Sequence, residues 1–389
     1  MQSISRIYLD HNATSPLRPE AREAMLAALG SPFNPSSVHT EGRKGKSLLE
    51  SARETIARGI GGKPKNLIFT ASATEAANLA LTPALLSGQD RRPIDRLLIA
   101  GGEHPAIFQG HRFSPQAIEI LPLEKNGQLS LEALQTAISR YPGKKLALAL
   151  QAVNNETGVI QPIEMACDLI KKEAGIFICD ATQAIGRVDL SLEKVKADLL
   201  FFSSHKLGGP AGAGALIIAS DDLAIQDILI KGGGQEAGRR AGTENIPAVV
   251  GFAAAFKSAL ADLNKERPRL KQLQQDVEDY LVAIGSSYVV FGQQSPRSPN
   301  TVAFAIPEID SQTLLIALDL AGVAVSSGSA CSSGKVKESH VLSAMGVREK
   351  SALRISLGWS STKRDVEEFG IILKNVVRDI HSRRSGLPL

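Results

Sequence analysis

The sequence has 389 residues, more than one hydrophobic core usually serves, so we expect one large and one smaller domain. Hydrophobic residues make up 43% of the chain and charged residues 22%, which excludes a disordered protein. The net charge is +4, and the 44 basic residues are spread along the chain, which argues against binding of nucleic acid or membranes.

Short apolar runs alternate with segments of helical length through the first two thirds of the chain. Helices are expected at Thr74–Leu86 and Leu131–Ile138. Strands are expected at Leu67–Thr70, Leu97–Ala100, Leu146–Leu150, Ile176–Cys179, Leu199–Phe202 and Ala215–Ala219. Near-continuous apolar strands separated by helices predict an α/β fold with a mostly parallel sheet covered on both faces. Ligands of such sheets bind at the carboxyl ends of the strands.

A long helical segment follows, from Asn245 to Ile284, with apolar residues at helix spacing. Pro268 is expected to break or kink it. We interpret this segment as the bridge to a second domain, which includes a strand at Thr301–Ile306. The expected division assigns residues 15–260 to the large domain, and residues 1–14 and 261–389 to the small domain.

The three cysteines, Cys167, Cys179 and Cys331, are odd in number and widely spaced. Such a set is no disulfide framework, and it indicates a reducing compartment. The N-terminal residues show no signal-peptide pattern, and no stretch approaches the roughly 18 uncharged apolar residues of a membrane span. His104 and His111 lack the spacing of a helical zinc pair, and no metal site is expected. The sequence therefore predicts a soluble, cytoplasmic protein.

Two polar motifs follow neighbouring predicted strands. Lys206 closes the motif Ser203-Ser204-His205-Lys206 directly after one strand, where an amine can form a Schiff base with an aldehyde cofactor, although a surface lysine shows the same local pattern. Asp180 ends the preceding strand, where a carboxylate can keep a pyridinium nitrogen protonated, although an aspartate there can equally cap a helix. The two residues together favour a pyridine aldehyde as cofactor.

A third motif, Ala71-Ser72-Ala73-Thr74-Glu75, opens a predicted helix after the strand ending at Thr70. Small residues at that position leave backbone N–H groups available to a phosphate at the positive end of the helix. A simple capping motif has the same composition, and the two interpretations are compatible.

These motifs belong to a longer ordered set: Ala73-Thr74-Glu75, Glu103-His104, Asn154–Gly158, Asp180–Gln183, Ser203–Lys206, Gly242–Asn245 and Ser326–Cys331. The set resembles cysteine desulfurases of the NifS/IscS type, which belong to the class V aminotransferase branch of the fold-type I enzymes dependent on pyridoxal 5'-phosphate (PLP). The likeness covers essentially the whole chain, from Tyr8 to beyond Arg354. It implies a large PLP-binding domain, whose mostly parallel mixed sheet lies between helices, and a smaller α+β domain.

The resemblance also implies a role for each site residue. Lys206 would hold PLP and abstract the Cα proton of the substrate, Asp180 would pair with the pyridine nitrogen, and Gln183 would bond the phenolic oxygen of the ring. His104 would stack on the ring. The phosphate would be held by Ala73, Thr74, Ser203 and His205, and by Thr243 from the other subunit of a homodimer. The substrate carboxylate would be held by Asn155 and Arg354, with Asn34 as a further candidate.

Cys331 decides among the reactions that this fold supports. Its surroundings, Ser326 to Gly334, are small and polar, so we expect an accessible thiol in a mobile loop. In the resemblance, its thiolate attacks the sulfur of L-cysteine, which gives alanine and a persulfide that passes to an acceptor such as an iron–sulfur scaffold. The catalytic set is then Cys331, Lys206 and His104.

Other functions stay open at this point. An aminotransferase, a kynureninase-like hydrolase or a selenocysteine lyase would share the fold, and a non-enzymatic scaffold is a further alternative. The sequence assigns no role to His340, and His11 is interpreted as a variation that could alter the entrance to the site.

Overall fold

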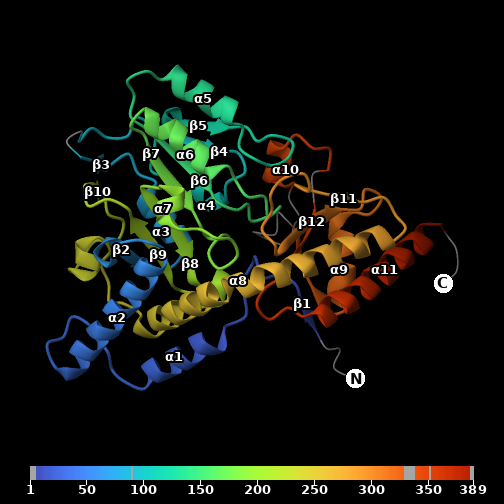
Figure 1. Cartoon of the computed structure of the whole chain (residues 1–389), viewed down its shortest axis with the longest axis horizontal. Helices are drawn as coiled ribbons and strands as arrows, with labels where there is room; N and C mark the ends of the chain where they lie inside the picture. Colours follow the sequence, from blue (N-terminus) through green and yellow to red (C-terminus); the bar gives the residue numbers. More distant parts are fainter. Residues whose placement is uncertain (1–5, 89–90, 328–337, 350–351, 386–389) are drawn as a thin grey trace.

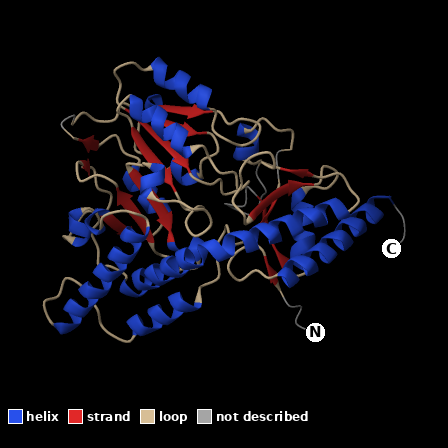
Figure 2. Ribbon diagram, viewed as in Figure 1, coloured by secondary structure: helices blue, strands red, loops and turns tan. Residues whose placement is uncertain are grey.

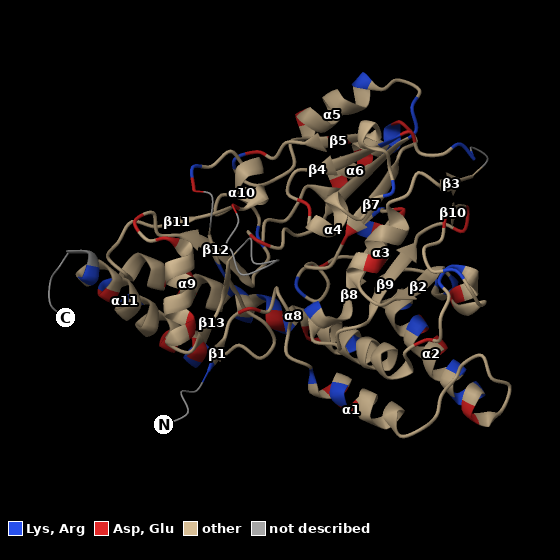
Figure 3. Ribbon diagram, turned by 180° about the vertical axis from the view of Figure 1, so that it is seen from behind, with Lys and Arg blue, Asp and Glu red and all other residues tan. Residues whose placement is uncertain are grey.

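The computed structural model describes residues 6–88, 91–327, 338–349 and 352–385. These residues form a larger body around a seven-stranded sheet and a smaller body around a four-stranded sheet (Figure 1). Helices cover both sheets (Figure 2). Basic and acidic residues are interspersed over both bodies (Figure 3), as the even spread of charge along the sequence suggests.

The large sheet has the strand order β2-β9-β8-β7-β6-β4-β5. Its strands are β2 (Leu67–Thr70), β4 (Arg96–Ala100), β5 (Ile118–Leu121), β6 (Leu146–Gln151), β7 (Ile176–Asp180), β8 (Leu199–Ser203) and β9 (Gly214–Ile218). Strands β5, β4, β6, β7 and β8 run parallel, and β9 is antiparallel to both β8 and β2. All six predicted strands are confirmed within one residue at each end. The edge strand β5 was not predicted, because it is half-buried and polar at Glu119.

Hydrophobic cores lie on both faces of this sheet. Phe202 and Phe177 point into one core, and their neighbours Phe201 and Ile178 point into the other. This double burial explains why the strands read as continuous apolar runs rather than as alternating patterns. The covering helices are α1 (Pro19–Leu29), α2 (Thr40–Gly59), α3 (Ala73–Ala80), α4 (Pro105–Phe108), α5 (Leu131–Arg140), α6 (Ile163–Lys172) and α7 (Leu192–Val195).

The predicted helix Thr74–Leu86 is wrong in its second half. Helix α3 ends at Ala80, and β3 (Leu85–Ser87) then pairs antiparallel with β10 (Leu223–Ile225). Pro83 explains the difference, because a proline disfavours helical backbone at the residue before it and offers no N–H to continue the helix.

Helix α8 (Ile246–Ala283) joins the two bodies. Its first half packs against α1 and α2 with Phe252 and Phe256 in the core of the large body, and its second half places Leu273 and Val277 in the core of the small one (Figure 1). The helix is not broken at Pro268, which is exposed, so water can bond the carbonyl that the proline leaves unpaired. Among the described residues, α8 alone is long and apolar enough to span a membrane, but half of its most apolar window is buried in the protein.

The small body combines both ends of the chain. Strand β1 (Ile7–Tyr8) pairs parallel with β13 (Val323–Ala324). The four-stranded sheet has the order β11 (Val289–Val290), β12 (Thr301–Ala305), β15 (Leu353–Ser356), β14 (Ser326–Ser327). Helices α9 (Ser311–Leu320), α10 (His340–Ala344) and α11 (Lys363–Ser385) complete it. Because Ile7 and Leu9 share a core with the second half of α8, we propose the domain division 15–260 against 1–14 and 261–389.

Candidate active site

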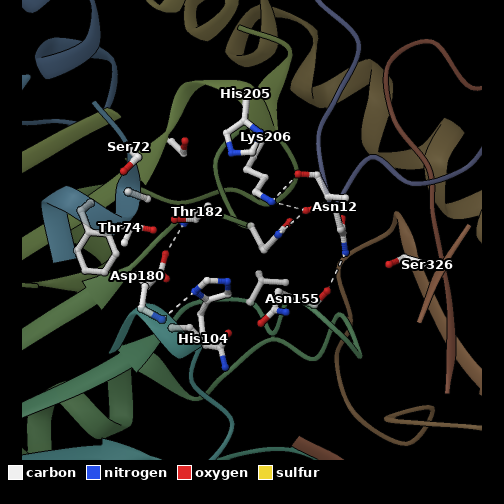
Figure 4. Close-up of a pocket in the computed structure, with 18 of the residues that line it drawn as sticks. Asn12, Ser72, Thr74, His104, Asn155, Asp180, Thr182, His205, Lys206 and Ser326 are labelled. Carbon is white, nitrogen blue, oxygen red and sulfur yellow. Dashed lines mark hydrogen bonds between the residues drawn. The ribbon is translucent and has the colours of Figure 1, made fainter. Parts of the chain in front are cut away.

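A cavity of about 390 Å³ lies at the carboxyl ends of the parallel strands, between the two bodies. Gln151, Asp180 and Ser203 end three neighbouring strands and line it. The N-terminal segment at Asn12 and the small body at Ser326 close it from the other side (Figure 4). The cavity brings together most of the predicted site residues: Ala73, Thr74, His104, Asn155, Asp180, Gln183, Ser203, His205, Lys206 and Arg354.

Lys206 lies in a single turn of 3-10 helix, Ser204–Leu207, that follows β8. Its amine points into the cavity and donates to the carbonyl oxygens of Asn12 and Ala13, at 2.7 Å each (Figure 4). Both acceptors belong to the N-terminal segment, so the amine is positioned by a part of the chain distant in sequence.

Asp180 lies at the end of β7 and accepts a hydrogen bond from the N–H of Thr182 at 2.8 Å. Burial raises the pKa of this carboxyl, and the bond from the N–H of Thr182 and the charge of Lys206 act in the opposite direction. The hydroxyl oxygen of Thr182 is buried without a hydrogen-bond partner among the described residues. No ion pair joins Asp180 to another described residue, so a cationic nitrogen in the cavity would find its carboxylate available.

His104 occupies the N-cap of the short helix α4, where its Nδ1 accepts from the N–H of Ala106 at 3.1 Å. Burial, and after it the charges of Lys206 and His340, lower the pKa of His104 to about 4. The ring is therefore neutral near pH 7, and its proton sits on Nε2 because Nδ1 is an acceptor. The predicted Glu103-His104 motif thus supplies a flat, uncharged ring at the cavity wall.

The opposite end of the cavity has the features of an anion site. Ser72, Ala73 and Thr74 form the start of α3 (Figure 4), and Ser72 Oγ accepts from the N–H of Glu75 at 3.1 Å. The chain passes so close here that a Cβ at Gly214 would lie 2.6 Å from the carbonyl carbon of Ser72. This close approach packs β9 against the start of the helix. Ser72 therefore caps this helix, and the cap leaves the terminus compatible with the predicted anion binding.

Ser203 and His205 line the same end of the cavity. The Nδ1 of His205 lies 3.2 Å from the hydroxyl of Thr14. Burial, and after it the charges of Lys206 and Arg187, lower the pKa of His205 to about 4. The ring is neutral and acts as a hydrogen-bonding group rather than as a cation.

Arg354 reaches the cavity from β15 of the small body. Its Nη2 pairs with Asp10 at 2.8 Å, and its Nη1 donates to the carbonyl of Asn155 at 2.9 Å. The Nε of Arg354 and the side-chain Oδ1 of Asn155 are buried without hydrogen-bond partners in the described part of the chain. The guanidinium of Arg354 is thus held in place by Asp10 and Asn155, and its Nε–H donor still has no partner there. Such a group suits a small carboxylate ligand.

Asn12 is a site residue that sequence reasoning did not find. Its Nδ2 donates to Thr301 Oγ1 at 3.0 Å and to the carbonyl of Asn155 at 3.3 Å, and its own carbonyl accepts from Lys206 and from Gln183. In the sequence, the one feature that pointed to Asn12 was the polar run that follows the apolar residues Ile7–Leu9. Ser72 and Thr182 also line the cavity, and they lie inside motifs that the sequence analysis quoted.

Several predicted residues lie elsewhere. Thr243 and Asn34 are exposed and do not line this cavity, and Cys331 lies outside the described residues. His11 is buried away from the cavity, with its Nδ1 3.0 Å from Ser15 Oγ, so it does not shape the entrance. His340 is half-buried rather than a surface residue, and its Nε2 lies 2.8 Å from the carbonyl oxygen of Glu103.

Comparison with known proteins decides the family. The Aminotransferase class-V family profile matches residues 7–369. A putative cysteine desulfurase IscS 1 of Bacillus subtilis is 36% identical over 387 residues, which cover 96% of this chain and 99% of the relative. Cysteine desulfurase IscS 1 of Archaeoglobus fulgidus is 34% identical, with 96% and 98% covered.

The chain belongs to the cysteine desulfurase family of class-V aminotransferases. The solved structure of a NifS-like protein from Rickettsia africae superposes with a TM-score of 0.85 at 32% identity, and covers 96% of this chain and 99% of its own. The expected fold class is thereby confirmed, together with the PLP dependence of the family.

The cavity residues fit PLP. The ring needs a carboxylate near its nitrogen, an amine for its aldehyde and an anion site for its phosphate. Asp180, Lys206 and the start of α3 supply these three groups around one cavity of suitable size. The unmatched oxygens of Thr182 and Asn155 are polar groups that a compact polar ligand would satisfy.

Proposed function

We propose that this protein removes sulfur from L-cysteine, releases L-alanine and holds the sulfur as a persulfide on Cys331. The observation that carries the proposal is the convergence of Lys206, Asp180, His104 and Arg354 on one cavity at the strand ends. Bound PLP would supply an electron sink that makes the Cα–H bond of the substrate acidic. Lys206 and Asp180 would hold the cofactor, together with His104, Gln183 and the phosphate-binding group Ala73, Thr74, Ser203 and His205.

The protein's own groups would divide the remaining work. Arg354 and Asn155 would hold the substrate carboxylate, which fixes the Cα–H bond toward the amine of Lys206. Lys206 would take that proton. The Cys331 thiolate would then form a sulfur–sulfur bond with the substrate, the carbon–sulfur bond would break, and its electron pair would stay with carbon, which takes up a proton as alanine forms.

The other two cysteines are poor nucleophiles. Cys179 is fully buried in β7, and burial raises the pKa of its thiol well above the usual range. Burial also raises the pKa of Cys167 to about 11, and its thiol donates to the carbonyl of Lys196. Since a thiolate is required for attack on sulfur, these two residues support the assignment of the persulfide to Cys331.

We also propose a homodimer. Thr243 is exposed and absent from the cavity of its own chain, which suits a residue that serves the site of a second copy. Asn34 is exposed in the same way, and the neighbouring Val38 and Leu29 are apolar side chains with 88% and 64% of their surface exposed. Light scattering coupled to size-exclusion chromatography tests the dimer, and a monomeric holoenzyme would contradict it.

The acceptor of the sulfur is proposed by class only: an acceptor protein such as an iron–sulfur scaffold. We place the reaction in the cytoplasm, since the described cysteines Cys167 and Cys179 are free thiols. The activity assay contains excess dithiothreitol, which reduces the persulfide, and measures alanine and sulfide released from L-cysteine beside amino transfer to a keto acid. Equal formation of alanine and sulfide supports a desulfurase, whereas amino transfer without sulfide would favour an aminotransferase.

A further inference from the structure

Arg187 is a buried cation directly behind the cavity. It follows Gln183 by four residues in the turn after β7, and only 7% of its surface is exposed. On its other side Arg187 lines a small void of about 30 Å³ together with Leu207 and with Trp359 of the small body. Its side chain therefore lies between the cofactor cavity and the small body rather than in solvent.

The hydrogen-bond partners of Arg187 are all uncharged oxygens. Nη1 donates to the side-chain Oε1 of Gln183, and Nη2 donates to the carbonyls of Lys206 at 3.0 Å and His11 at 3.2 Å. No carboxylate contacts this guanidinium among the described residues. Burial, and after it the charge of Arg354, lower the pKa of Arg187 to about 9, which still leaves it charged near pH 7.

A buried arginine without a carboxylate is costly, and packing alone would be served better by an apolar side chain. The contacts show what the charge does instead. Arginine has donors only, so the atom of Gln183 that faces it must be the amide oxygen. The amide nitrogen of Gln183 then turns the other way, where it donates to the carbonyl of Asn12 at 3.1 Å; both Gln183 and Asn12 line the cavity.

Two groups of the cofactor site are fixed in this way. Gln183 can present only N–H donors to the cavity, and the backbone that carries the Lys206 amine is held by Arg187 and by Ser15 Oγ, 3.1 Å from the same carbonyl. We propose that Arg187 is a positioning residue of the PLP site, which orients the Gln183 amide as a donor toward the cofactor. This inference rests on the proposed function.

The test is a double-mutant cycle in the full-length chain, with PLP itself as the probe. Arg187→Met frees the Gln183 amide to rotate, and Gln183→Ala removes it. Each single variant should bind PLP about tenfold more weakly, the loss expected for one hydrogen bond to a charged acceptor. Both should shift the visible absorbance maximum of the bound cofactor in the same direction. The double variant should bind PLP no more than about twofold more weakly than Gln183→Ala does, because Arg187 acts through Gln183.

Arg187→Lys keeps a donor-only cation opposite the amide oxygen, so it should keep the wild-type absorbance maximum and lose less affinity than Arg187→Met. If Arg187→Met fails to fold, the cycle is run with Arg187→Lys, and the same lack of additivity is expected. Arg297→Met is the matched control: Arg297 is also buried, but it pairs with Glu278 and does not line the cavity. It should lower the melting temperature without moving the absorbance maximum.

The inference would be overturned if the two losses of PLP affinity multiplied in the double variant, or if Gln183→Ala bound PLP as tightly as the wild type. Either result would leave the proposed function intact. A wild-type chain that binds no PLP would overturn both.

Discussion

The side-chain amine of Lys206 donates to the main-chain carbonyl of Asn12 at 2.7 Å. The same Asn12 bonds Thr301 and Asn300 of the small domain through its side chain, both at 3.0 Å. The amine that would carry the cofactor is thus tied to the small body through the N-terminal segment, where it bonds Asn12 and also Ala13. Cofactor attachment and domain docking share one set of hydrogen bonds.

Lys206→Ala should abolish covalent attachment of PLP and lower desulfurase activity by about 10³-fold or more, because the amine both holds the cofactor and moves the Cα proton. The visible absorbance of the purified protein and its borohydride-trapped PLP measure the attachment. Lys172→Ala, which changes an exposed lysine of α6, should leave both unchanged. Wild-type attachment in the Lys206→Ala variant would place the cofactor on another amine.

Arg354→Met should raise the KM for L-cysteine about tenfold or more, with a smaller effect on kcat, because a charged hydrogen bond to the substrate carboxylate is lost. Steady-state kinetics with L-cysteine measure both constants. Arg364→Met serves as the control, since that arginine is exposed on α11 and pairs with Glu368. An unchanged KM in Arg354→Met would mean that the carboxylate is bound elsewhere.

Glu156 should make stability depend on pH. It is buried, Ser339 Oγ donates to it at 2.6 Å, and burial raises the pKa of its carboxyl from 4.5 to about 7. The folded protein therefore holds this proton more tightly than the unfolded chain does. The resulting stability is present below pH 4.5 and is lost as the pH rises through about 7.

Glu156→Gln removes this titration and keeps an acceptor for Ser339. The free energy of unfolding of the wild type, relative to Glu156→Gln, should fall between roughly pH 5 and pH 8 in urea titrations. A difference that stays constant over this range would show that Glu156 does not titrate in the folded protein.

Buried His11 should change the stability with pH in the opposite direction. Burial, and after it the charges of Arg187, Arg18 and Arg269, lower the pKa of His11 from 6.5 to about 3. Neutral His11 therefore contributes stability that is fully present above pH 6.5 and is lost as the pH falls through about 3. In urea titrations the wild type should lose stability relative to His11→Gln over that range. A His11→Gln variant whose pH dependence matches that of the wild type would contradict the assignment.

The strands and the motif order could be predicted from the sequence because they depend on local patterns: apolar runs set the strands, and the strand ends place Asp180 and Ser203 at one edge of the sheet. The features that could not be predicted depend on contacts between residues distant in sequence. The role of Asn12 arises only when the small domain docks, and the burial of Arg187 arises only when the turn after β7 packs against the N-terminal segment. The end of α3 differs from the prediction for a local reason: Pro83 stops a helix that the surrounding residues would otherwise favour.

The sulfur-carrying role of Cys331 is tested most directly by intact-mass measurement of the PLP-loaded protein after incubation with L-cysteine, followed by peptide mapping. The proposed mechanism predicts one added sulfur, located on Cys331, and none in a Cys331→Ala variant that still binds PLP and changes its absorbance with L-cysteine. Sulfur found on Cys167 or Cys179, or an unchanged rate of alanine formation in Cys331→Ala, would contradict it.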